Sequence, residues 1–221
     1  MLTIQRKISS FNYSSRNGNS VKYIVLHYTG NKGDTAKNNV DYFYGGNRGA
    51  SAHYFVDDNS IWQSVKESNS AWAVGDGHGI HGITNQNSIS IEMCCNSSGV
   101  ITEKTENNAL ELVKYLMTKY NISNSNVVRH YDASRKLCPN WTANNWSRWT
   151  SFKNKLEDNN ESEMNYSMHI FSQNWYLKNY PDVAKSEKYK ITLISIILNM
   201  VLKRVENHCH QYQLNIMRAN I

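Results

Sequence analysis

Three side chains that can ligate a metal ion stand where elements of secondary structure are expected to end. His27 lies near the end of the apolar run KYIVLHYT (22–29), which is typical of a strand buried on both faces. His130 lies at the end of the short strand predicted for VVRHY, and Cys138 follows on the next loop. If these strands end at one edge of a sheet, two imidazoles and a thiolate could ligate zinc and leave a fourth position for water. Spacing alone leaves a purely structural role open for each of these residues. A single histidine is usually a polar group with its hydrogen bonds satisfied, and a single cysteine is usually a small buried apolar residue.

Two charged residues could serve such a metal. Glu92 is the only acidic residue in the strand predicted for SISIEMC (88–94), and an unpaired buried carboxylate is costly. Lys136 stands two residues before Cys138. A carboxylate can move protons and an ammonium group can stabilise an oxyanion. Taken alone, either residue could equally face solvent.

Periodicity and turn residues predict the elements that must position these groups. A helix capped by Asp34 should end at Gly45-Gly46, and the apolar positions of 102–120 repeat at helical spacing. Two short strands should flank a turn in AHYFVDDNSIWQSV, the segment 66–87 should be a long loop, and a closing helix should end near Glu157. This order predicts an α/β domain with a single mixed β-sheet flanked by helices.

Composition limits the class of protein. The chain has 221 residues, 40% of them hydrophobic, which suits one main domain with an appendage. The net charge of +6 suits an anionic partner such as an anionic polymer or a bacterial wall, and no nucleic-acid-binding motif accompanies it. The N-terminus lacks the apolar region of a secretory signal. The most apolar stretch, 191–202, is too short to span a bilayer as a helix.

Five segments occur in an order that resembles a known family. They are YIVLHYTG, SAHYFVDDNSIWQSV, AWAVG, NSISIEMC and RHYDASRKLCP. Over residues 20–157 the chain resembles the zinc-dependent N-acetylmuramoyl-L-alanine amidases, in the phage endolysin and autolysin branch of the family that includes peptidoglycan recognition proteins. The resemblance implies that His27, His130 and Cys138 ligate Zn²⁺. It also implies that Glu92 is the catalytic carboxylate and that Lys136 stabilises the transition state.

The chain also departs from this family's pattern. Relatives often carry a histidine after the tryptophan of the AWAVG segment, but here Ala73 follows Trp72. We expect His53 to line or support the cleft without ligating the metal. His78 and His81, in the glycine-rich loop, could compete for metal, but loop histidines are more often solvated.

The resemblance predicts a peptidoglycan hydrolase that cleaves the amide between N-acetylmuramic acid and the L-alanine of the stem peptide. The alternatives are a non-catalytic peptidoglycan-binding module and an amidase that recycles wall fragments inside the cell. Loss of the cysteine ligand would favour the binding module, and Cys138 is present. We expect a monomer that binds bacterial peptidoglycan and no nucleic acid. It would be made in the cytoplasm and act at the cell wall after release, as a phage lysin does, or after secretion by a non-classical route.

The sequence predicts three regions. Residues 1–157 form the catalytic domain, 158–166 a polar linker, and 167–221 a truncated repeat of a wall-binding type. In the last region, WYLKNYPDVA (175–184) resembles the start of a short repeat of wall-associated proteins. Codons can be chosen for the stretch after Asn199 that give the missing end of this repeat in a shifted frame. We therefore hypothesise that residues from about 190 onward are a frameshifted translation, the alternative being a real C-terminal helix.

Overall fold

The computed structural model describes the backbone of residues 1–170 and the side chains of residues 1–157. The chain divides into two compact units, residues 1–158 and 159–221. Of the second unit, only the helical backbone of 159–170 is described. No helix in the described part of the chain combines the length and apolar character needed to cross a membrane. The tail from about residue 190, including its predicted frameshift, lies outside the described residues.

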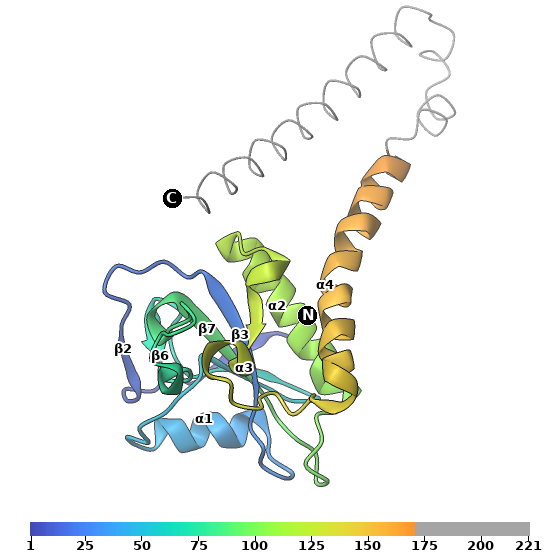
Figure 1. The fold of residues 1–221 in the computed structure, drawn as a ribbon. Coiled ribbons are helices and arrows are strands. Elements are labelled where there is room, and N and C mark those ends of the chain that lie inside the picture. The colour runs from blue at the N-terminus through green and yellow to red at the C-terminus, as the bar shows by residue number, and fades with distance from the viewer. Residues whose placement is uncertain (171–221) are drawn as a thin grey trace, which may run out of the picture. The chain divides into compact units, whose positions relative to one another are not determined.

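A six-stranded mixed sheet forms the centre of the first unit (Figure 1). Its strand order is β1-β5-β4-β7-β3-β8, and all neighbours are parallel except the hairpin pair β4 and β5. In that order the strands are Ile4–Arg6, Ile61–Gln63, Tyr54–Val56, Ser88–Met93, Tyr23–Tyr28 and Val127–Arg129. A separate antiparallel pair is made by β2 (Tyr13–Ser15) and β6 (Asn69–Ala71).

Helices cover both faces of the sheet. The long helix α2 (Glu103–Tyr120) and the start of α4 (Ala143–Ile170) contribute to the main core on one face. On the other side of the sheet, α1 (Ala36–Tyr44) and α3 (His130–Ser134) contribute to two smaller clusters (Figure 1). Three short 3₁₀ turns lie in the connections: η1 (Gly75–Gly77), η2 (Asn85–Asn87) and η3 (Asn124–Asn126).

Alternation along the two central strands separates the core from the site. Side chains of successive strand residues point to opposite faces. Ile24 and Leu26 on β3, with Ile89 and Ile91 on β7, therefore belong to the main core under α2. His27 and the residues in step with it face the opposite side, which α1 and α3 cover only in part.

The predicted fold class is confirmed, with local differences. Thr35, not Asp34, caps α1 by accepting from the Asn38 amide, because Asp34 accepts instead from the Cys95 amide at 2.8 Å. The segment 66–87, predicted as a loop, contains β6 and two 3₁₀ turns. His130 begins α3 instead of ending a strand. The predicted linker 158–166 is helical, as part of α4, and its role as a domain boundary stays a prediction.

Candidate metal centre and active-site cleft

Strand register brings the first ligand candidate next to the candidate catalytic carboxylate. His27 on β3 is the direct partner of Glu92 on the parallel neighbour β7, so both side chains share one face of the sheet. His27 Nδ1 lies 3.9 Å from Glu92 Oε1. Phe55 on β4 is the next partner in the same row and forms an apolar wall beside the carboxylate.

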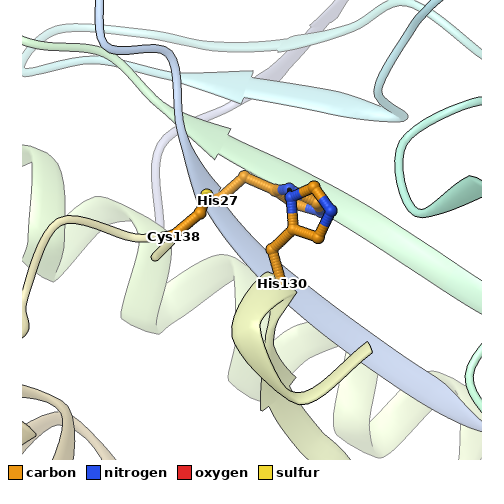
Figure 2. Close-up of side chains that lie close together, drawn as sticks. All are labelled: His27, His130 and Cys138. Atoms are coloured by element: carbon orange, nitrogen blue, oxygen red, sulfur yellow. Dashed lines mark hydrogen bonds between the residues drawn. The ribbon is translucent and has the colours of Figure 1, made fainter. Parts of the chain in front are cut away.

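The other two ligand candidates are carried by the segment that follows β8. His130 is the first residue of α3, and the Tyr131 amide donates to the Cys138 carbonyl at 3.0 Å, which folds the loop back. His27, His130 and Cys138 are all buried, and their ligand atoms lie within 4.8 Å of one another (Figure 2). The two histidine Nδ1 atoms face each other at 3.0 Å. The structure thus brings together the three residues predicted as ligands.

Burial shifts the pKa of all three ligand candidates. Burial lowers the pKa of His27 well below its ordinary value, and the nearby His130 and Lys136 lower it further. Burial also lowers the pKa of His130, although Asp76 partly offsets this effect. Both imidazoles are therefore neutral at physiological pH, which is the form that ligates metals. Burial raises the pKa of Cys138 to about 12, so its thiolate needs a nearby cation to form at neutral pH.

Two buried polar atoms at the site have no protein partner. Among the residues that the structure describes, His27 Nε2 and Glu92 Oε2 are buried without a hydrogen-bond partner. Burial raises the pKa of Glu92 to about 8, against the opposing effect of Lys136. A carboxylate of this kind can exchange protons near neutral pH when a reactant reaches it.

These groups open into one cleft of about 320 Å³. Lys136 is exposed and lies on its rim, while Trp72 and Ala73 form part of its wall. Trp72 Nε1 donates to Ser14 Oγ at 2.7 Å, which ties this wall to β2. Other polar and apolar residues also line the cleft, among them Asn31, Asn39, Phe43, Ala50 and Ser51.

The remaining histidines of the first unit have other surroundings. His53 is buried beside β7, where its Nδ1 accepts from the Ser90 amide at 3.1 Å and its Nε2 lies 3.0 Å from Arg16 Nη2. It supports the sheet and does not line the cleft. His78 and His81 are exposed and do not belong to the ligand group.

Sequence reasoning missed one carboxylate at the site. Asp76 on η1 accepts from His130 Nε2, which lies 2.8 Å from Oδ1 and 3.1 Å from Oδ2. The available signal was its position in the glycine-rich run GDGHG, as the only acidic residue between Glu67 and Glu92.

Two imidazoles, a thiol and a carboxylate that share a cleft are typical of metal-dependent hydrolases. Residues 17–141, more than half of the chain, match the family model described as N-acetylmuramoyl-L-alanine amidase. The chain therefore belongs to the N-acetylmuramoyl-L-alanine amidase family, whose members are metal-dependent, and His27, His130 and Cys138 could hold the metal.

Individual relatives agree with this assignment. N-acetylmuramoyl-L-alanine amidase CwlL of Bacillus licheniformis is 37% identical over 147 residues, which are 62% of this chain and 41% of that protein. The solved structure of PlyL is similar with a TM-score of 0.60 and 35% identity, covering 70% of this chain and 97% of PlyL. The catalytic domain of XlyA gives a TM-score of 0.60 at 32% identity, covering 70% of this chain and 99% of that domain. The chain spans less than half the length of the curated relatives CwlL and XlyA.

Proposed function

We propose that this protein is a zinc-dependent N-acetylmuramoyl-L-alanine amidase. It would hydrolyse the amide bond between the lactyl group of N-acetylmuramic acid and the L-alanine of the stem peptide in peptidoglycan. The observation that carries the proposal is the convergence of His27, His130 and Cys138 with Glu92 in one cleft. Membership in the family and the amidase names of the relatives support the choice of substrate.

The donor set fits zinc. Imidazole nitrogen and thiolate sulfur are preferred zinc ligands, and ligand atoms of a tetrahedral site lie roughly 3.3–3.8 Å apart. The two Nδ1 atoms, 3.0 Å apart, lie just below this range, and all the ligand atoms of the group lie within 4.8 Å of one another. Three protein ligands leave one position open, as in catalytic zinc sites.

Each residue then has a definite task. Bound zinc supplies Lewis acidity to the scissile carbonyl and lowers the pKa of water. Glu92 accepts a proton from the attacking water, whose oxygen forms the new bond to the lactyl carbonyl carbon. The Lys136 ammonium group stabilises the oxyanion that develops on the carbonyl oxygen. Glu92 returns its proton to the L-alanine nitrogen as the carbon–nitrogen bond breaks, giving a free amine and a carboxylic acid, which loses its remaining proton to solvent.

Glu92→Gln tests this function, because glutamine keeps the shape but cannot accept the proton. Zinc content should stay at one ion per chain, while the release of N-terminal alanine from purified walls should fall by ~10²–10⁴. Glu111→Gln, an exposed position on α2 (side chain 48% exposed), is the matched control and should keep the wild-type rate. New reducing-end sugars in place of alanine amines would contradict the proposal. Wall binding without alanine release would favour the non-catalytic module.

The proposal extends to cellular context. We infer that the protein acts on the bacterial cell wall as an endolysin or autolysin, and as a monomer. Residues 1–157 would carry the chemistry, and residues 167–221 would be a truncated repeat of the wall-binding type. The endolysin names among similar structures support this view of where it acts.

A further inference from the structure

We propose that Asp76 is a positioning residue that fixes the tautomer and the orientation of the ligand His130. This inference rests on the proposed metal site, but it concerns a residue outside the predicted ligand and catalytic set. Its basis is the contact of both Asp76 carboxylate oxygens with His130 Nε2, at 2.8 and 3.1 Å.

The chemistry of the contact determines the tautomer. A neutral imidazole carries one N–H group, and an ionised carboxylate can only accept hydrogen bonds. The hydrogen of His130 is therefore held on Nε2, and the lone pair of Nδ1 points away from Asp76. That Nδ1 atom faces His27 Nδ1 at 3.0 Å, inside the ligand group. Carboxylates that accept from the far nitrogen of a ligating histidine orient the ring and raise its basicity.

The two histidine ligands need different support. His27 is held within β3, which pairs with β7 on one side and with β8 on the other. Its Nε2 has no partner among the described residues. His130 lies beyond the end of β8, at the start of the five-residue helix α3. A side-chain restraint at this position replaces the rigidity that the sheet gives to His27.

A glycine beside Asp76 allows the loop to approach α3 closely. A Cβ atom on Gly77 would lie 2.2 Å from the Ala133 carbonyl oxygen and 2.9 Å from its carbon, which is a severe clash with backbone. Only glycine lets η1 pack against α3 at this distance. The Asp76 side chain is 48% exposed, so burial does not hold it in place. The close approach at Gly77 is what sets its distance from His130.

The test measures zinc affinity on the full chain by competition with a chromogenic chelator at one fixed pH. Asp76→Ala should weaken zinc binding by ~10–100-fold, the usual effect of losing such a partner. Asp76→Asn should lose less, because its Oδ1 can still accept from Nε2. Glu111→Gln removes a carboxylate with the same 48% exposure and should bind zinc as the wild type does.

A second readout does not depend on metal or activity. In the metal-free wild type, ¹⁵N NMR of the His130 ring should show hydrogen on Nε2, and Asp76→Ala should give a mixture of tautomers. Gly77→Ala should reproduce the loss of zinc affinity, and the double variant with Asp76→Ala should lose little more, because both act through one contact.

Wild-type zinc affinity in a folded Asp76→Ala protein would overturn the inference, and so would an unchanged His130 tautomer. A wild-type protein that binds no zinc would instead refute the proposed function, while the tautomer measurement would still test Asp76.

Discussion

Replacing Glu67 by glutamine should lower the free energy of unfolding by about 2–3 kcal/mol at neutral pH. Glu67 stands in the segment between β5 and β6, with a side chain only 10% exposed. Its carboxylate accepts hydrogen bonds from the hydroxyls of Tyr54 and Tyr120, and Lys119 Nζ lies 2.7 Å from Oε2. This one side chain therefore joins β4 to the C-terminal end of α2.

The magnitude follows from the kinds of bond that change. A hydrogen bond to a charged group contributes ~1.5–3 kcal/mol and a neutral one ~0.5–1.5, so each tyrosine bond should lose about 1 kcal/mol. The Lys119 side chain is 41% exposed, so that ion pair adds at most ~0.5 kcal/mol. Glu67→Ala should cost a further ~1–3 kcal/mol, because it leaves the hydroxyl of Tyr54, a residue 1% exposed, without this acceptor.

The effect should depend on pH in a definite direction. Burial raises the pKa of Glu67, but hydrogen bonds from Lys119, Tyr120 and Tyr54 outweigh it, so the pKa lies below its ordinary value of 4.5. The unfolded chain then binds the proton more readily than the folded one. The stabilisation is complete above the unfolded pKa and is lost as the pH falls through the folded pKa. The difference between wild type and Glu67→Gln should therefore shrink below about pH 4.5.

Urea denaturation measures this difference, with tryptophan fluorescence as the probe. The protein is first treated with a chelator to remove the metal, and the measurement is repeated at a series of pH values from neutral to acid. Glu111→Gln is again the control and should stay within ~0.5 kcal/mol of wild type, as surface substitutions usually do. A Glu67→Gln protein as stable as the control at neutral pH would refute the reasoning. A difference that stays constant through acid would show that the carboxylate charge is not its source.

Three other outcomes are expected. Chelation should abolish alanine release, and added zinc should restore it. Cys138→Ala should lose both metal and activity. A Cys138→Ala protein that keeps stoichiometric zinc would exclude Cys138 as a ligand. Lys136→Ala should keep zinc and lower the rate by ~10²–10³, and a wild-type rate on intact walls would show that its ammonium group does not act on the oxyanion. Thr102→Ala should cost ~1 kcal/mol of stability, because the Thr102 hydroxyl caps α2 by accepting from the Thr105 amide. Thr118→Ala, at an exposed position of α2, is the control and should leave stability unchanged in the same denaturation assay.

Local pattern was sufficient for the elements whose sequence repeats at a clear period. The continuous apolar run around His27 predicted β3, and the helical repeat of 102–120 predicted α2. Position at the strand ends made a ligand group of His27, His130 and Cys138 conceivable, and the family resemblance made it specific. In the structure the three side chains lie together, and the parallel pairing of β3 with β7 sets His27 beside Glu92. Their roles stay a prediction.

Features that depend on distant partners could not be read from local pattern. Asp76 and Glu67 both lie in the segment predicted as a loop, and their partners lie 54 residues away on His130 and 53 on Tyr120. β2 is only three residues long and all three residues are exposed, so it has no apolar alternation to detect. At the start of α1 two neighbouring residues could cap, and the choice of Thr35 follows from the distant Cys95 amide that occupies Asp34.

The two faces of the sheet have different roles, which explains how the site can hold buried polar atoms that lack hydrogen-bond partners. On one face, apolar residues of β3 and β7 are completely buried under α2 and supply the hydrophobic stabilisation of the sheet. On the other face, the same strands carry His27 Nε2 and Glu92 Oε2, buried without partners among the described residues. Each such group costs ~1–3 kcal/mol of stability. Because the alternation of a strand fixes both faces at once, a one-residue shift of β3 would move His27 into the core and Leu26 into the cleft. The apolar face thus holds the register that the chemistry on the opposite face requires.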